Sequence, residues 1–461
     1  MNNRLMLSLV VGISLLAFSA EAAGLFLAPR GVRPLGRAGA FVAGADDPNS
    51  LSYNPAGLAF SHSGMLIDFG IPLHFTDYTR QNPLSGEFMP TVQGQGLTLP
   101  SPTIATAYRF EALPEVTFGT SVHADYPLLQ NWPDKLPDGT PAPQRYAILN
   151  YKGTAVVKLS GGAAWEPIKG LAIGAAFQMF AGLFSSEVTL SNCDGAIFCS
   201  FPESPDYDAR IQFASKPFIS PGFHLGVIYS PISLVRFGLA FESGYKVAAD
   251  STLRTRLPSA AAFSQATSEP DEPEGVVRFD LPLAVRAGIE FRDEDHWRVE
   301  IAWVWENWSV HDVLELDIEE AVIRNVVGIG DYRLTKVEIP RYLTDTWSLR
   351  VGAEGKLPSQ HPITLRGGFA YEPSAIEDEF LTAMSVDTDK VIMAFGAGTE
   401  LWGIAFDFTY SFIFMPTRTV LKSDVLQTTA ARPAWEGRTT IGEGIYESQA
   451  HVLGLGASWA L

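Results

Sequence analysis

The stretch GVRPLGRAGAFVAGADDPNSLSYNPAGLA, from Gly31 to Ala59, decides how the rest of the chain is interpreted. It is rich in glycine and alanine, and it carries turn-forming residues at DDPN (46–49) and at NP (54–55). Glycine and proline at this density interrupt both helices and strands. Because a long, strand-like sequence follows it, we interpret this segment as a plug inside a β-barrel.

The sequence after the plug alternates between large apolar residues and polar or small ones. Every second residue from Met65 to Phe75 is large and apolar, and the same pattern recurs at 277–291, 297–305 and 404–414. A period of two predicts strands with one apolar and one polar face. A soluble sandwich buries the apolar face, whereas an outer-membrane barrel turns it toward lipid.

Three features favour the transmembrane barrel. The predicted strands run from 10 to 22 residues, longer than the strands of most soluble sheets. Tight turns at 166–170, 292–295 and 357–360 alternate with long polar connections, as in outer-membrane barrels. Aromatic residues that could form an interfacial girdle lie near the strand ends: Tyr108, Phe110, Trp165, Trp297 and Trp402.

We therefore predict an all-β fold, a transmembrane antiparallel β-barrel of about 14 strands with an N-terminal hatch in its lumen. The predicted strands are 63–75, 102–111, 115–126, 147–165, 171–190, 209–230, 233–249, 276–292, 296–316, 340–357, 362–373, 388–400, 403–421 and 447–461. The predicted outward loops are 76–101, 127–146, 191–208, 250–275, 317–339, 374–387 and 422–446, with 250–275 expected to be mobile.

The N-terminus predicts export from the cytoplasm. Arg4 precedes an apolar core from Leu5 to Phe18, and the small residues Ala20 and Ala22 suit cleavage by a signal peptidase. We divide the chain into a signal peptide (1–22), a hatch (23–61) and a barrel (62–461) in the outer membrane of a Gram-negative bacterium. The formal net charge of −18 argues against a nucleic-acid partner.

Two short motifs in the opening stretch carry a resemblance to a known family. GRAGA (36–40) and NPAGL (54–58) resemble the hatch of the FadL/TodX family of outer-membrane transporters. The resemblance implies passive import of long-chain fatty acids or aromatic hydrocarbons by a monomer. It assigns the hatch to Gly36, Arg37, Gly39, Asn54, Pro55 and Ala56.

The same resemblance implies a route for the substrate. Extracellular loops three and four capture the hydrophobic compound, a lumen pocket binds it, the hatch rearranges, and a kink in the third strand releases it sideways into the membrane. The loop candidates are Ile197, Phe198, Phe201 and Phe263, and the lateral-gate candidates are Gly119, Ser121 and His123. The final strand, 451–461, resembles those read by the barrel-assembly machinery, and lipopolysaccharide is the expected lipid neighbour.

The polar face of the predicted strands mixes both charges. These residues form either a salt-bridge lattice that holds the plug or a site where Arg278, Arg286 or Arg350 binds a substrate carboxylate. The predicted inward charges are Arg236, Glu242, Arg278, Asp280, Arg286, Glu290, Arg298, Glu300, Arg350, Glu354, Arg366 and Asp407, and Arg30, Arg33 and Arg37 of the hatch are further candidates.

The sequence lacks motifs for catalysis, and we predict that the protein is not an enzyme. Its histidines are scattered, and neither a metal-binding spacing nor a cofactor motif is present. Cys193 and Cys199 are expected to form a disulfide in an outer loop. The alternatives to hydrophobic transport are a general porin and a structural barrel with an immobile plug.

Overall fold

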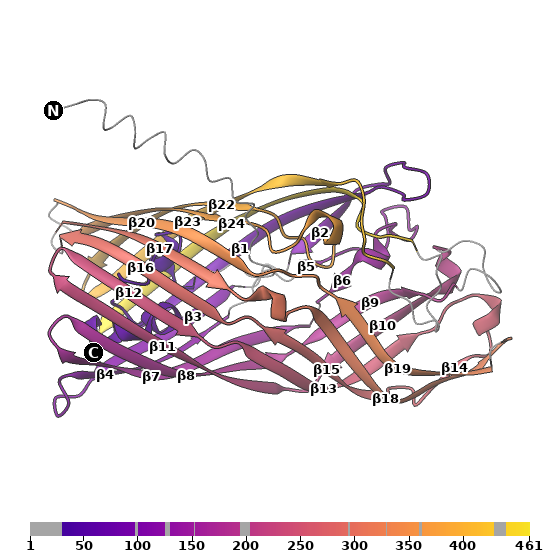
Figure 1. The fold of residues 1–461 in the computed structure, drawn as a ribbon, viewed down its shortest axis with the longest axis horizontal. Helices are drawn as coiled ribbons and strands as arrows, with labels where there is room; N and C mark the ends of the chain where they lie inside the picture. The colour runs from indigo at the N-terminus through magenta and orange to yellow at the C-terminus, as the bar shows by residue number, and fades with distance from the viewer. Residues whose placement is uncertain are drawn as a thin grey trace.

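In the computed structural model, fourteen antiparallel strands close into a barrel (Figure 1). The structure describes residues 30–96, 100–124, 130–151, 153–193, 203–293, 296–328, 330–358, 362–427 and 439–461. The barrel strands are β1 (Gly64–Arg80), β3 (Ser101–Arg109), β4 (Val116–His123), β7 (Ala155–Ile168), β8 (Leu171–Leu183), β11 (Phe218–Ile232), β12 (Val235–Glu242), β16 (Ala284–Asp293), β17 (Trp297–Glu306), β20 (Thr346–Leu357), β21 (Ile363–Glu372), β22 (Lys390–Leu401), β23 (Ile404–Val420) and β24 (Gly444–Ala460). The prediction of a 14-stranded barrel is confirmed.

The barrel closes where its first strand pairs with its last. β1 and β24 pair in unbroken register from Gly64 opposite Ala460 to Arg80 opposite Gly444. Tight turns lie at one end, and by the usual asymmetry of outer-membrane barrels this is the periplasmic end. The predicted girdle residues Tyr108, Phe110, Trp165, Trp297 and Trp402 are all exposed.

A second sheet of eight strands extends the wall beyond the end of the barrel at which the long connections lie. It contains β6 (Leu149–Asn150), β9 (Ser185–Ser191), β10 (Asp208–Ser215), β13 (Tyr245–Arg256), β14 (Thr267–Glu269), β15 (Glu274–Leu281), β18 (Val313–Val326) and β19 (Gly330–Pro340). β2 (Val92–Gly96) and β5 (Gln130–Asn131) add to the edge of the barrel sheet beside β1. Figure 1 shows β13, β15, β18 and β19 running on from the barrel wall.

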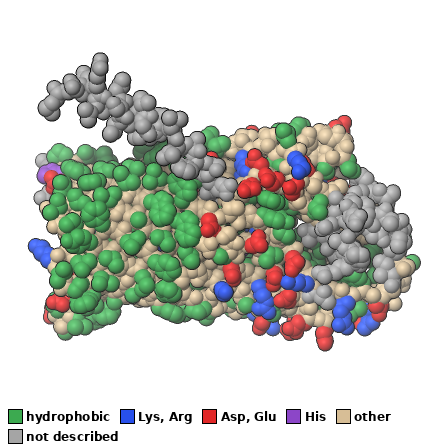
Figure 2. Space-filling model, viewed as in Figure 1, with side chains coloured by type: hydrophobic (Ala, Val, Ile, Leu, Met, Phe, Trp, Pro, Cys, Tyr) green, Lys and Arg blue, Asp and Glu red, His purple; other side chains and the backbone are tan. Residues whose placement is uncertain are grey.

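The apolar face of the wall points outward in the barrel sheet and inward in the second sheet. In β12, Leu239 points outward and Glu242 is buried in the lumen, whereas in β13 Val247 and Leu253 are buried inside. The alternation changes phase at 243–244, and it does so again at 216–217 and 282–283. On the face shown in Figure 2, hydrophobic side chains consequently predominate over the barrel, and the charged side chains gather over the second sheet.

This inversion corrects several sequence predictions. Most of the long strands predicted across the barrel rim are pairs of strands, and the predicted loop 317–339 is mostly the hairpin of β18 and β19. The predicted mobile loop 250–275 contains the end of β13, all of β14 and the start of β15. Arg278, predicted in the lumen, lies on the exposed face of β15 and pairs with Asp317 at 3.0 Å, and Asp280 shares that face. A phase change leaves the alternating composition intact, so sequence periodicity does not reveal it.

The helices are short and occur in the hatch and the connections. They are α2 (Val32–Leu35), α3 (Ser50–Tyr53), η1 (Pro55–Phe60), η2 (Arg145–Ala147), η3 (Pro205–Tyr207), η4 (Ala261–Phe263), η5 (Trp308–Val310) and η6 (Asp378–Phe380). Among the described residues, we find no helix with the length and hydrophobicity needed to cross a membrane.

A charge on the lipid-facing side of the barrel should destabilise it, whereas a charge on the second sheet should not. Leu239→Lys places an ammonium in lipid, and we expect a loss of about 2–4 kcal/mol in the free energy of unfolding, measured by urea titration in vesicles. Val276→Lys is the matched control, because Val276 lies opposite Asp250 and Asp317 on the outer sheet. Equal destabilisation by both variants would contradict the inversion.

Candidate ligand site and hatch

Residues 30–60 fill the lumen at the level of the barrel strands. Nearly all of their side chains are buried, and Figure 1 shows this indigo segment enclosed by the wall. The wall is built to admit the segment closely: a Cβ added at Gly368 would lie 2.3 Å from the carbonyl carbon of Arg37, and one at Gly174 would lie 2.2 Å from the nitrogen of Ala56. Glycine at these wall positions lets the hatch backbone approach the strands.

Arg37 is the fully buried centre of the contact between hatch and wall. Its guanidinium donates to Glu354 at 2.8 Å, to Glu300 at 2.9 Å and to Glu290 at 3.3 Å, so that strands β20, β17 and β16 all contribute a carboxylate. Ion pairs and hydrogen bonds of this kind offset much of the free-energy cost of burying a charge. The predicted salt-bridge lattice is thus present at this position.

Glu300 also binds the hatch backbone directly. Its carboxylate accepts hydrogen bonds from the backbone nitrogens of Val42, Ala43 and Gly44 at 2.6, 2.8 and 3.0 Å. Three backbone donors that converge on one carboxylate form a strong, charge-assisted anchor. The small residues of this turn leave room for that approach.

A second layer of ion pairs lies next to Arg37. Arg33 binds Glu354 at 3.0 Å and Asp46 at 2.8 Å, and Arg298 binds Asp46 at 2.6 Å. Arg366 in turn bridges Glu354 and Asp407. Hatch and wall therefore share one continuous network of charges.

The predicted hatch motifs have clear structural roles. Asn54 caps η1 by accepting from the nitrogen of Ala56 at 3.2 Å, and its amide donates to the carbonyls of Val42 and Val227. Pro55 occupies the first turn of η1, where its missing N–H is not needed. Gly36 ends α2, and Gly39 adopts a φ of 79°, which favours glycine.

The predicted lateral-gate residues share the lumen face of β4, the third barrel strand. A Cβ at Gly119 would lie 2.9 Å from the Leu58 side chain, and His123 Nδ1 lies 3.4 Å from Ser52 Oγ of the hatch. Ser121 is buried between them. The ladders from β4 to β3 and to β7 are regular as far as His123, where the strand ends.

Arg286 and Arg350 lie where the hatch meets the outer half of the lumen. Arg286 binds Glu242 at 2.7 Å, and Arg350 binds Glu372 at 2.7 Å and the carbonyl of Ala38 at 3.1 Å. Both line a cavity of about 20 Å³ beside Tyr53. Their charges are already paired with wall carboxylates.

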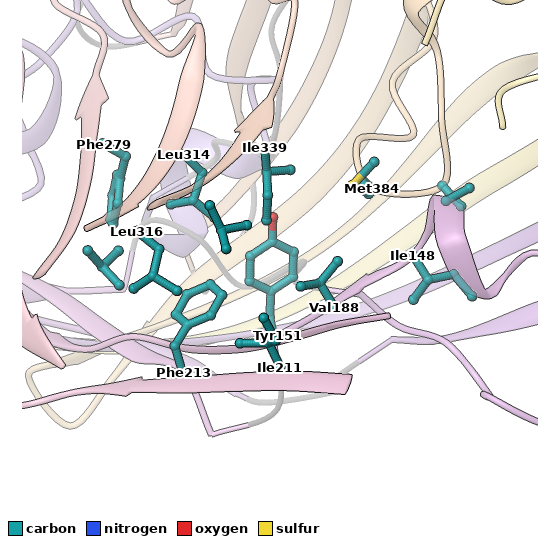
Figure 3. Packing of buried hydrophobic residues seen from close by; sticks show 14 of the residues in the cluster. Ile148, Tyr151, Val188, Ile211, Phe213, Phe279, Leu314, Leu316, Ile339 and Met384 are labelled. Atoms are coloured by element: carbon teal, nitrogen blue, oxygen red, sulfur yellow. The ribbon is translucent and has the colours of Figure 1, made fainter. Parts of the chain in front are cut away.

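An apolar pocket of about 50 Å³ lies where the barrel passes into the second sheet. Among its lining residues are Phe180, Phe184, Phe279 and Leu314, together with the polar groups of Tyr151, His311 and Arg341. It borders a large cluster of buried side chains between the strands of the second sheet, in which Tyr151 lies among Phe213, Val188 and Ile339 (Figure 3). The pocket therefore offers an apolar surface with few polar groups.

Arg341 is the cation of this pocket, and it is 2% exposed. Its Nη1 donates to the Tyr151 hydroxyl at 3.1 Å, whereas Nε and Nη2 have no hydrogen-bond partner in the described part of the chain. His311 Nδ1 donates to the carbonyl of Asp280 at 2.7 Å. Burial, together with the Arg341 charge, lowers the pKa of His311 to about 3, so its ring is neutral at physiological pH.

The family model described as "Outer membrane protein transport protein (OMPP1/FadL/TodX)" matches residues 13–460. The chain belongs to this family. It is accordingly an outer-membrane β-barrel of the kind that carries hydrophobic compounds passively across the outer membrane of Gram-negative bacteria, and it is not an enzyme. Among curated protein sequences, none matches it significantly.

Solved structures of FadL/TodX-type transporters share the fold at low sequence identity. A Pseudomonas aeruginosa FadL homologue superposes with a TM-score of 0.74 at 16% identity, covering 95% of this chain and 99% of that one. The Ralstonia pickettii toluene transporter TbuX gives 0.58 at 15% identity, covering 96% and 100%. The Pseudomonas putida toluene transporter TodX gives 0.56 at 14% identity, covering 96% and 98%.

Other predicted site residues of this FadL/TodX-family chain are separated from the pocket or not described. Phe263 lies in η4 and packs against the cluster of the second sheet. Ile197, Phe198, Phe201 and Cys199 lie outside the described residues, whereas Cys193 is buried and disulfide-bonded. In the described part of the chain, no group of three or more potential ligands is placed to hold a metal.

Sequence reasoning missed Arg341 and His311. Both lie in the linking segments between barrel strands and the second sheet, where no alternation marks a side chain as inward. The sequence features that mark these linking segments are prolines and short polar runs, such as Pro340 before Arg341. At such points the side chains that face inward change from even-numbered to odd-numbered positions or the reverse.

Removing the central arginine should loosen the hatch without unfolding the barrel. Arg37→Gln leaves three carboxylates without their shared partner, a loss of about 3–5 kcal/mol for a buried pair. We expect increased ion conductance in planar bilayers, approaching that of a variant lacking residues 31–59. Arg278→Gln, which breaks only an exposed pair, should conduct as the wild type does; a closed Arg37→Gln channel would contradict this role.

Acid should destabilise the region around His311. The unfolded histidine has a pKa near 6.5 and the folded one about 3. Between these values the unfolded state binds more protons, so stability falls as pH falls, by up to about 1.4 kcal/mol per unit. Thermal unfolding followed by tryptophan fluorescence should show the contribution of His311 in the wild type and in His296→Gln, an exposed control, and a less steep dependence of stability on pH in His311→Gln. An unchanged slope in His311→Gln would refute the assignment.

Proposed function

We propose that this protein imports amphipathic hydrophobic compounds, with long-chain carboxylic acids preferred over bare hydrocarbons. The observation that carries the proposal is the apolar pocket with Arg341 on its wall. An alkyl chain gains from leaving water for the aromatic lining. A carboxylate supplies the acceptor that Nε and Nη2 of Arg341 lack within the described residues.

The pathway that we propose continues inward to the hatch. Phe180 contacts Tyr245, Lys158 lies 5.2 Å from the Tyr245 ring centre, and Lys158 binds Glu242, which also binds Arg286. The lining thus changes from aromatic to charged toward Tyr53 and the hatch. Arg286 and Arg350 are the candidate second contacts for a carboxylate there.

Release requires movement of the hatch and of the third strand. The contacts of Gly119 with Leu58 and of His123 with Ser52 support a coupling between the two. We propose that hatch rearrangement withdraws this support and opens the wall beyond the end of β4. In the earliest step, we propose that the segments 191–208 and 250–275 capture the compound through Ile197, Phe198, Phe201 and Phe263.

The remaining proposals concern the export and membrane insertion of the protein and the roles of its segments. Residues 1–22 act as the signal peptide, 23–61 as the hatch and 62–461 as the barrel. The barrel-assembly machinery inserts the chain through its last strand, and the protein works as a monomer surrounded by lipopolysaccharide and other outer-membrane lipid. Gly36, Arg37, Gly39, Asn54, Pro55 and Ala56 form the mobile contact of the hatch, and Cys193 and Cys199 close a loop.

Ligand binding should depend on the charge of Arg341. Native mass spectrometry of the detergent-solubilised protein should detect bound decanoate but weaker binding of decanol and toluene. Arg341→Gln should lower decanoate affinity at least tenfold and leave decanol unchanged, because only the carboxylate uses the cation. Leu314→Trp, which fills the pocket, should reduce both.

The controls separate the alternatives. Arg278→Gln should bind as the wild type does, because Arg278 lies outside the lumen. Absence of binding across the panel, combined with high ion conductance of the wild type, would favour a general porin. Absence of both binding and conductance would favour a structural barrel with an immobile plug.

A further inference from the structure

A cavity of about 780 Å³ lies on the periplasmic side of the hatch, and we call it the vestibule. It is next to the tight turns, because His62, His296 and Lys356 line it. The proposed import pathway, from the Arg341 pocket to the hatch and the end of β4, does not pass through this cavity. We propose that the vestibule holds an oxyanion site, formed by Arg236 and Arg109, for a carboxylate with a short apolar tail.

Arg236 is buried in the vestibule wall, and none of the described carboxylates forms an ion pair with it. It is 3% exposed, its Nε donates weakly to Ser230 Oγ at 3.4 Å, and its Nη1 has no hydrogen-bond partner in the described chain. Arg33 and Arg298 of the same cavity each bind carboxylates at 3.1 Å or less. A buried guanidinium without a counter-ion is a site to which an anion is attracted.

The carboxylates nearest to Arg236 are already shared by other cations. Asp46 and Glu290 act on it electrostatically, as do the cations Arg292 and Arg298. Asp46 binds Arg33 and Arg298, and Glu290 binds Arg37 and Arg298. The positive charge of Arg236 therefore remains uncompensated by a dedicated partner.

The hatch fixes the orientation of this cation. The Arg236 guanidinium carbon lies over the Phe60 ring, 4.2 Å from its centre, so the two form a cation–π contact. This contact uses the π-system of Phe60 and leaves Nη1 of Arg236 without a hydrogen-bond partner among the described residues, available to a planar oxyanion.

Arg109 approaches the same part of the hatch from β3. It donates to the carbonyl of Ala59 at 2.6 Å and to Thr117 Oγ1 at 2.9 Å, and it forms no ion pair with the described residues. Because Ala59 precedes Phe60, the two arginines flank the end of η1. Phe60 and Leu66 also line the vestibule and offer apolar surface to a short alkyl chain.

Calorimetric titration of the full-length protein in detergent tests this inference with hexanoate, hexanol and inorganic phosphate. We expect hexanoate but not hexanol to bind, with affinity reduced at least tenfold in Arg236→Gln and less in Arg236→Lys, which keeps the charge. Arg278→Gln is the matched control and should bind hexanoate as the wild type does. A heat-modifiable band on SDS gels verifies that each variant is folded.

The vestibule site does not depend on the proposed transport function, and the two can be tested separately with Arg236→Gln and Arg341→Gln. Loss in Arg236→Gln with retention in Arg341→Gln supports the vestibule site. Equal hexanoate affinity in wild type and Arg236→Gln, or loss in Arg341→Gln alone, overturns it. Competition by phosphate identifies a general oxyanion site that also takes free periplasmic anions, and lack of competition identifies one specific for the carboxylate of an amphiphile.

Discussion

The contact on which the structure depends is the buried guanidinium of Arg37 among Glu290, Glu300 and Glu354. Three wall strands place carboxylates in the lumen, where they would repel one another without a cation. The wall arginines Arg298 and Arg366 pair with two of these carboxylates, and the hatch supplies the one cation that all three share. It also supplies the backbone N–H groups that donate to Glu300. Plug and wall are therefore electrostatically incomplete without each other, and the lumen of this barrel cannot be understood as an empty pore.

The change of surroundings along the wall is the second constraint. Within the membrane the apolar face of each strand meets lipid, and beyond the membrane the apolar face must turn inward to avoid water. The chain meets both demands with short breaks such as Ser243–Gly244 and Pro282–Leu283, which shift the alternation by one residue. The apolar pocket lies at this boundary.

The architecture was predictable from the sequence, but much of the candidate site was not. Runs that alternate between apolar and polar residues, such as 277–291, allowed the barrel strands to be counted. This alternation is present whichever face of the strand is apolar. The same runs misplaced Arg278 and Asp280, since alternation carries no sign of which face is inward. Arg37, Asn54 and Pro55 could be identified because a compact motif surrounds them. Arg236 was predicted to point inward, but its lack of a carboxylate partner, like that of Arg341, is visible only in three dimensions.

The seam between the first and last strands has a consequence for the order of assembly. β1 and β24 pair along their whole length, and the hatch that precedes β1 is enclosed behind that seam. A charged segment anchored by Arg37 to three neighbouring strands cannot readily thread into a ring that is already closed. Docking of the plug is easier while the sheet is still open. Pairing of β24 with β1 then closes the barrel around a plug that is already in place.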